Sequence, residues 1–432
     1  MLKFVATIAK TMINRFKSFV DGRASVFKNF LALGILQGTN FLIPLIIMPY
    51  LVSTIGIDSY GVVSFVQVVM IYFFSLTDYG FAITATQEIA TNKSDLSKVS
   101  KIFSKVVSTK IVLVLFSALS ITLLLFVVPD LKEEQLTVIL GFALVIGQTS
   151  LPTWFFQGME KMKYITYINL AAKLIFTILI FVFINEKSDY PYVLFFFGLG
   201  NLLSGVFGIF YAIRNYDITF RLATVREVQS ELKKGWGLFV ANFSITSYMN
   251  SNLFILKLFA TNEIVGYYSV AEKIVMAIRQ LLSVFSQAIF PHICQLVHDS
   301  YSKVVLFFKQ VYIPFTLVII LVCISIFLFS EEVIGIFAAS EVEGINNLLQ
   351  ILVFVPVIVC LNIFPSQLLL AYNLRRAYTR VMIFGSVLNV ILNIALASQF
   401  IAKGTALSVI ITESFILVGL YLIVRKGKSM IS

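Results

Sequence analysis

The amino-acid sequence predicts an all-helical integral membrane protein with twelve transmembrane helices. Hydrophobic residues make up 59% of the 432 residues and charged residues only 13%, and the mean hydropathy is +0.94. A soluble domain carries about a quarter charged residues, so the whole chain belongs in a bilayer. Apolar runs of about 20 residues, enough to cross a hydrocarbon core of ~30 Å, recur along the chain. They are too long and too uniformly apolar for barrel strands, which leaves helices.

The twelve predicted helices follow one another with short connections. We place them at 28–51, 60–82, 106–129, 136–158, 164–184, 191–213, 235–258, 266–290, 306–329, 346–370, 379–401 and 404–424. On the side away from the termini the longest loop is 330–345. Such loops leave little room for an extramembrane catalytic domain.

Lysine and arginine determine the predicted orientation. Of the 33 basic residues, only three occur in the loops on the membrane side opposite to the termini: Lys132, Lys187 and Lys403. Because cytoplasmic segments carry the excess of Lys and Arg, both termini are predicted to be cytoplasmic. The net charge of +11 then reflects membrane topology, and nucleic-acid binding is not implied.

The halves of the chain echo each other. The second and eighth predicted helices open with matching residues: Gly61, Ser64 and Gln67 in one, Gly266, Ser269 and Glu272 in the other. This pattern favours two six-helix repeats of the same orientation, although helix ends of any multi-pass protein could show it. The predicted domains are an amphipathic cytoplasmic segment 1–27, a first bundle 28–213, a linker 214–234, and a second bundle with a basic tail 235–432. For the first segment, a disordered basic tail is the alternative to a helix on the inner leaflet.

Polar side chains recur at helical spacing on four predicted helices. The amides among them are Gln37, Asn40, Gln67, Asn242, Asn250, Asn389 and Asn393. Spacings of three, four and seven residues place side chains on one helix face. Two interpretations are open: a hydrated vestibule between the bundles, which we favour, or interhelical hydrogen bonds that contribute about 0.6 kcal/mol each.

Two charges, Arg279 and Glu413, lie near the centres of long apolar runs. A lone charge there costs about 2.5–3.5 kcal/mol on insertion scales, so it faces a bundle interior or a watery cavity. Either the two form a buried ion pair that fixes the bundle, or Arg279 binds an anionic substrate while a carboxylate exchanges ions. The candidates for ion coupling are Glu413, Asp78 and Glu272, and those for anion binding are Arg279, Lys273 and Lys257. Lys257 can also reach the membrane surface, and Asp78 can be solvated.

The sequence contains no pattern typical of a cofactor, metal or catalytic site. Cys294, Cys323 and Cys360 suggest neither a disulfide framework nor a metal site, and His292 and His298 lack ligand spacing. No Walker motif or nucleophile elbow occurs in the sequence. We therefore expect a protein that is not an enzyme.

Several segments resemble one family of exporters. These segments are "LQGTNFLIPLIIMPYLVSTIGIDSYGVVSF", "DYGFAITATQEIA", "PTWFFQGMEKMKYIT" and "GYYSVAEKIVMAIRQLLSVFSQAIFPHI". They are similar to Wzx-type flippases of lipid-linked oligosaccharides such as O-antigen repeat units, in the polysaccharide-transporter branch of the multidrug/oligosaccharidyl-lipid/polysaccharide exporter superfamily. The similarity covers nearly the whole chain after the first 28 residues.

The resemblance implies a fold and a substrate. The fold would be two six-helix bundles in a V, with alternating access and a cationic central cavity. The substrate would be an undecaprenyl-pyrophosphate-linked oligosaccharide, moved from the cytoplasmic to the periplasmic leaflet of the bacterial inner membrane. The protein would be a monomer that contacts membrane lipid and other polysaccharide-assembly membrane proteins. The alternatives are a cation-coupled multidrug exporter of the same superfamily, and a polysaccharide polymerase or ligase. A drug-susceptibility screen would separate a multidrug exporter from a flippase. A polymerase or ligase is disfavoured because such enzymes need a large outer loop with basic residues, and the longest loop, 330–345, contains no Lys or Arg.

Overall fold

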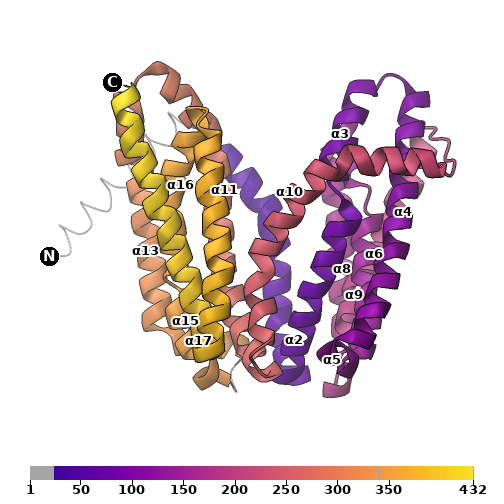
Figure 1. Cartoon of the computed structure of the whole chain (residues 1–432), viewed down its shortest axis with the longest axis horizontal. Coiled ribbons are helices and arrows are strands. Elements are labelled where there is room, and N and C mark those ends of the chain that lie inside the picture. The colour runs from indigo at the N-terminus through magenta and orange to yellow at the C-terminus, as the bar shows by residue number, and fades with distance from the viewer. Residues whose placement is uncertain (1–23, 339–340, 432) are drawn as a thin grey trace.

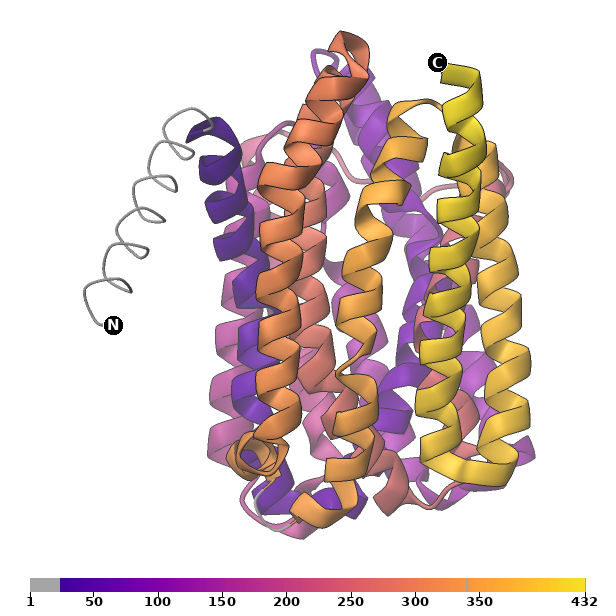
Figure 2. The ribbon, with the colours of Figure 1, turned by 90° about the vertical axis from the view of Figure 1, so that its left-hand side faces the viewer.

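The computed structural model describes residues 24–338 and 341–431, and every regular element in these ranges is a helix (Figures 1 and 2). Side chains are described for residues 43–425, apart from 298, 301, 339 and 340. The predicted amphipathic segment therefore lies outside the described side chains. The all-helical membrane fold predicted from the sequence is confirmed.

Two groups of helices form a V, with two long helices between them (Figure 1). The N-terminal bundle contains α3 (Phe81–Asn92), α4 (Leu96–Val127), α5 (Pro129–Glu133), α6 (Gln135–Ser150), α7 (Thr153–Gly158), α8 (Met162–Phe183), η1 (Lys187–Asp189) and α9 (Tyr192–Asn215). The C-terminal bundle contains α11 (Asn262–Asp299), α12 (Tyr301–Phe307), η2 (Phe308–Tyr312), α13 (Ile313–Leu328), α14 (Ser330–Ala338), α15 (Val342–Leu352), α16 (Val355–Ala371) and α17 (Arg375–Ile431). Between them run α2 (Ala24–Asp78) and α10 (Val225–Lys257).

The predicted spans map onto fewer, longer helices. Among the described residues, nine helical segments are long and apolar enough to cross a membrane. Two of these segments hold two predicted spans each, because the backbone breaks at Gly56 (φ 78°) in α2 and at Ile401 (φ 52°) in α17. The predicted span 235–258 lies in α10, which is not among the nine. The count of twelve crossings stays a prediction.

The bundles meet at one end of the molecule and diverge at the other. We call the end that carries the C-terminus the C-terminal face and the other end the opposite face (Figure 1). The largest apolar core lies at the vertex of the V and joins both halves, with Val66 and Met70 of α2 and Tyr268 and Ala271 of α11 among its buried members. Separate apolar clusters stabilise each arm. Each arm therefore has a core that does not depend on the other arm.

The segment "PTWFFQG" forms an aromatic core at the C-terminal face of the N-terminal bundle. Trp154, Phe155 and Phe156 are buried, and Phe103 of α4 lies 5.5 Å from Trp154 and 5.4 Å from Phe155 between ring centroids. Offset and edge-to-face aromatic pairs at such distances add about 0.5–1.5 kcal/mol each beyond burial. This motif therefore stabilises the bundle.

The linker between the halves is bound to α4. The hydroxyl oxygens of Ser100, Ser104 and Ser108 accept hydrogen bonds from the backbone N–H groups of residues 219, 221 and 223, at 3.2, 3.1 and 3.0 Å. Four residues of helix rise about 6 Å and two residues of extended chain span about 6.6 Å, so the two spacings match. The linker is therefore attached to the N-terminal bundle, and α10 begins inside the predicted linker 214–234.

Candidate functional site

Two glycines bring the halves into backbone contact near the opposite face. A Cβ atom on Gly61 would lie 1.9 Å from the carbonyl oxygen of Asn262, and one on Gly266 would lie 2.3 Å from that of Ile57. One helical turn further along, the Ser269 hydroxyl donates to Ser64 at 2.8 Å. The residues that echo each other in the sequence thus contact each other across the interface. Only glycine permits α2 and α11 to approach this closely.

The two predicted anion-binding lysines lie in contacts between the halves. Lys273 Nζ lies 2.7 Å from the hydroxyl of Tyr60 and 4.5 Å from the centre of its ring, which combines a hydrogen bond with a cation–π contact. Lys257 Nζ lies 3.5 Å from a carboxylate oxygen of Asp130 in α5. Both lysines therefore have a partner on the N-terminal side of the interface.

The two charges near the centres of apolar runs form an ion pair inside the C-terminal half. An Arg279 guanidinium nitrogen lies 2.9 Å from Glu413 Oε1, and the Asn362 amide donates to Glu413 Oε2 at 3.2 Å. The side chain of Glu413 is 8% exposed, whereas that of Arg279 is 27% exposed. The carboxylate is thus sealed, while part of the guanidinium stays accessible. Asn362 was missed from the sequence, where a single amide in an apolar run gave no signal.

The predicted polar stripes divide into two groups. Gln67, Asn242 and Asn250 are partly exposed, although the Asn250 amide donates to its own helix at Thr246 O, 2.8 Å away. The ion-coupling candidate Glu272 is also partly exposed. In contrast, Asn389 is 2% exposed and Asn393 is 0% exposed. Asn389 accepts from Ser251 at 3.4 Å, and Asn393 donates to Asn252 at 3.1 Å, so both join α17 to α10. These two have the geometry of interhelical hydrogen bonds.

The remaining predicted residues lie elsewhere. Asp78 is paired with Lys110 of α4 at 3.5 Å, on the N-terminal side. Lys110 is 7% exposed, lies within the predicted span 106–129, and was missed from the sequence. The side chains of Gln37 and Asn40 lie outside the described residues.

Solved structures with a similar fold are membrane transporters. The chain matches a structure titled lipid II flippase MurJ, inward closed conformation, with a TM-score of 0.66 and 13% identity, over 91% of this chain and 87% of that one. It matches an inward-facing multidrug resistance MATE family transporter with a TM-score of 0.63 and 15% identity, over 89% of this chain and 97% of that one. Identities this low show the fold alone.

Relatives with more similar sequences carry names from polysaccharide export. A protein of Escherichia coli (strain K12) named "Putative O-antigen transporter" is 28% identical over 420 residues, which is 95% of this chain and 99% of that protein. A protein of Shigella dysenteriae with the same name is 27% identical over 396 residues, 90% of this chain and 97% of that protein. The family model described as polysaccharide biosynthesis protein matches residues 26–297. The chain therefore belongs to the polysaccharide biosynthesis protein family, as its resemblance to the exporters predicted.

Proposed function

We propose that this protein moves an undecaprenyl-pyrophosphate-linked oligosaccharide from the cytoplasmic to the periplasmic leaflet of the bacterial inner membrane. It does so by alternating access between the two bundles and catalyses no covalent reaction. The observation that carries the proposal is the partly exposed guanidinium of Arg279, deep in the helices and held at one nitrogen by Glu413.

The barrier to this movement lies in the head group of the lipid. A hydroxyl transferred from water to hydrocarbon without a partner costs about 4–8 kcal/mol. An oligosaccharide with its pyrophosphate therefore needs a polar path, whereas the prenyl tail stays in the membrane. Polar side chains with partial exposure, such as Gln67, Asn242 and Asn250, supply hydrogen bonds to the sugars along this path.

Arg279 suits the pyrophosphate in particular. A guanidinium stays charged at physiological pH, and its fork of N–H donors matches phosphate oxygens. Glu413 holds the group through one nitrogen, and Asn362 holds Glu413, so the remaining donors stay oriented for an anion. When Glu413 separates from Arg279, its carboxylate is free to bind an ion, which couples transport to that ion. Glu272 and Asp78 are the other candidates for ion coupling.

The direction of loading follows from the basic residues. Most Lys and Arg residues lie in segments on the C-terminal face, which we assign to the cytoplasm. The bundles diverge toward that face (Figure 1) and touch near the opposite face. This conformation accordingly accepts the lipid-linked substrate from the cytoplasmic leaflet.

The test is complementation of a deletion strain. The wild-type protein should prevent accumulation of lipid-linked repeat units in the cytoplasmic leaflet, without changing susceptibility to a panel of cationic drugs. Arg279→Ala and Arg279→Glu should each lose this activity. Normal transport by both variants at normal protein levels would exclude the role of Arg279.

A second variant separates binding from folding. Removal of Arg279 alone leaves the buried Glu413 carboxylate unpaired, which costs about 3–5 kcal/mol. The double variant Arg279→Gln, Glu413→Gln removes both charges and should restore the protein level. If it also restores transport, Arg279 has only a structural role.

A further inference from the structure

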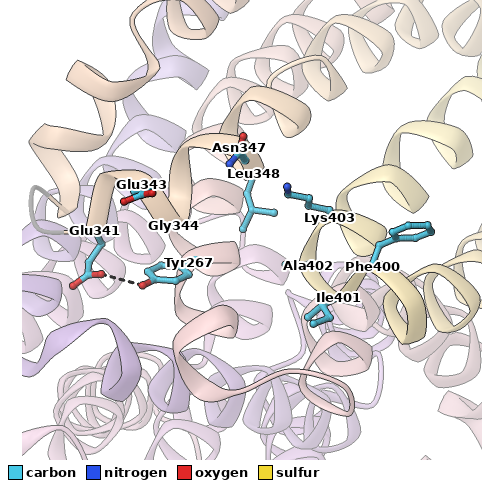
Figure 3. Close-up of a pocket in the computed structure, with 10 residues that line it drawn as sticks. All are labelled: Tyr267, Glu341, Glu343, Gly344, Asn347, Leu348, Phe400, Ile401, Ala402 and Lys403. Atoms are coloured by element: carbon cyan, nitrogen blue, oxygen red, sulfur yellow. Dashed lines mark hydrogen bonds between the residues drawn. The ribbon is translucent and has the colours of Figure 1, made fainter.

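A polar pocket opens at the opposite face, within the C-terminal half (Figure 3). Its volume is about 600 Å³. Tyr267 of α11 and the first turns of α15 form one wall, and the chain reversal at 400–403 within α17 forms the other. A volume of this size lies within the range of about 300–1,000 Å³ found for small-molecule sites.

The pocket offers polar groups that no other described side chain binds. Glu343, Asn347 and Lys403 line it and have no hydrogen-bond or ion-pair partner within the described part of the chain. Figure 3 shows Asn347 and Lys403 on opposite walls, with the Lys403 side chain extending toward the α15 wall. Glu341 lies 3.1 Å from the Tyr267 hydroxyl, but the closer acceptor for the single proton of that hydroxyl is Glu263. The site thus combines two carboxylates, Glu341 and Glu343, with one amide and one ammonium group.

We propose that this pocket binds sugar units of the transported oligosaccharide at the face where they are released. This inference rests on the proposed function. Sugar hydroxyls donate and accept, and here carboxylates accept, an ammonium group donates, and an amide does both. Phe400 and Ile401, which are exposed, supply apolar surface for the C–H face of a sugar ring. Two carboxylates against one lysine disfavour a pyrophosphate or an acidic sugar, so the pocket takes neutral or amino sugars.

The pocket adjoins the contact between the halves. Gly344 of α15 packs so closely on Tyr267 that a Cβ atom there would lie 2.5 Å from the tyrosine ring. The preceding residue on α11, Gly266, contacts α2. The pocket residue Tyr267 is therefore the neighbour in the chain of a residue in the interface that must separate when the substrate leaves.

Binding to the purified full-length protein in nanodiscs tests the inference. The probe is the soluble oligosaccharide released by mild acid from the strain's own lipid-linked repeat units, measured by calorimetry and saturation-transfer NMR. Glu343→Gln and Asn347→Ala should each weaken binding about tenfold, as expected from the loss of one or two hydrogen bonds. The matched control is Glu332→Gln, an identical charge change on α14 outside the pocket, which should bind like the wild type.

Three outcomes would overturn the inference: no binding to the wild type, equal binding to the wild type and both pocket variants, or pocket-dependent binding of calcium chloride alone. The double variant Arg279→Gln, Glu413→Gln should bind the soluble oligosaccharide normally, because the probe lacks pyrophosphate. If that variant binds normally while the wild type fails to complement the deletion strain, the proposed function fails and the pocket remains a sugar site.

Discussion

The interface between the two halves differs between its ends. Near the opposite face the halves touch through glycine backbones at Gly61 and Gly266, the 2.8 Å bond from Ser269 to Ser64, and Lys273 on Tyr60. Toward the C-terminal face the bundles diverge, and the connection is the linker and α10 (Figure 1). Hydroxyl and ammonium groups can bind water when they separate, which favours opening of the touching end, whereas the apolar core shared by the halves opposes it. At the diverging end, three hydrogen bonds hold the linker against α4.

The largest expected effect comes from filling the glycine contact. A Cβ atom at position 61 would lie only 1.9 Å from the carbonyl oxygen of Asn262, so Gly61→Val overpacks this contact. Overpacking costs about 1–3 kcal/mol or more. The population of the conformation in which α2 and α11 touch should therefore fall about tenfold or more. Transport in the complemented deletion strain should fall accordingly.

The control for this variant is Gly335→Ala, since an added Cβ on Gly335 of α14 meets no atom within 4 Å. It should transport like the wild type. Wild-type transport by Gly61→Val, at equal protein level, would show that closure at the opposite face is not needed.

At the diverging end, the serine contacts to the linker can be removed together. Ser100→Ala, Ser104→Ala and Ser108→Ala leave three backbone N–H groups without partners, at a cost of about 0.5–1.5 kcal/mol each. Hydrogen exchange of residues 218–224 should accelerate, and thermal stability should fall. Ser97→Ala, on the exposed surface of α4, should change neither. Unchanged protection of the linker in the triple variant would contradict the proposed attachment.

The turn at the touching end depends on backbone conformation at Gly56. Its φ of 78° and ψ of 161° lie in a region open essentially to glycine alone. Gly56→Ala meets no atom within 4 Å, so its expected loss of about 1–3 kcal/mol in the free energy of unfolding arises from the backbone alone. Gly237→Ala in α10, equally free of contacts, should instead stabilise the helix by about 1 kcal/mol. Equal stability changes for both would refute this account.

The smallest effect is a pH dependence at the start of α10. Hydrogen bonds from the Arg221 side chain and from the Thr224 backbone lower the pKa of Glu227 to about 2. Because the folded pKa is depressed, this stabilisation is present above the ordinary carboxylate pKa near 4.5 and is lost as the pH falls from there toward 2. Amide protection of residues 224–228, corrected for intrinsic exchange, should therefore decrease between pH 6 and pH 3. Glu227→Gln should abolish this pH dependence.

Most of the fold could be predicted from the sequence, because apolar length and charge asymmetry are properties of single segments. The predicted span 235–258 lies in α10 as well, although the polar residues of this helix lower its hydropathy. The echo of Gly61 and Ser64 in Gly266 and Ser269 suggested a repeat, but it could not show that these residues touch across the interface. Contacts between segments depend on how the bundles pack, which helical periodicity does not specify.

The site was predictable only in part. Arg279 and Glu413 were conspicuous because each lies near the centre of a long apolar run. The two residues form an ion pair, which was one of the two interpretations of these charges. The lysine partners Tyr60 and Asp130 could not be found, because neither has a distinctive sequence context. Asn389 and Asn393 look like cavity residues by spacing, yet they are buried between α10 and α17. Helical spacing indicates a shared face without indicating what that face meets.

Cross-linking across the touching end tests the central claim most directly. In a background where Cys294, Cys323 and Cys360 are replaced by Ala, the variant Ser64→Cys, Ser269→Cys should form a disulfide, because the native hydroxyl oxygens lie 2.8 Å apart. The oxidised protein should fail to move lipid-linked oligosaccharide across proteoliposome membranes, and dithiothreitol should restore transport. Full transport by a completely cross-linked protein would contradict an exporter that works by opening this interface.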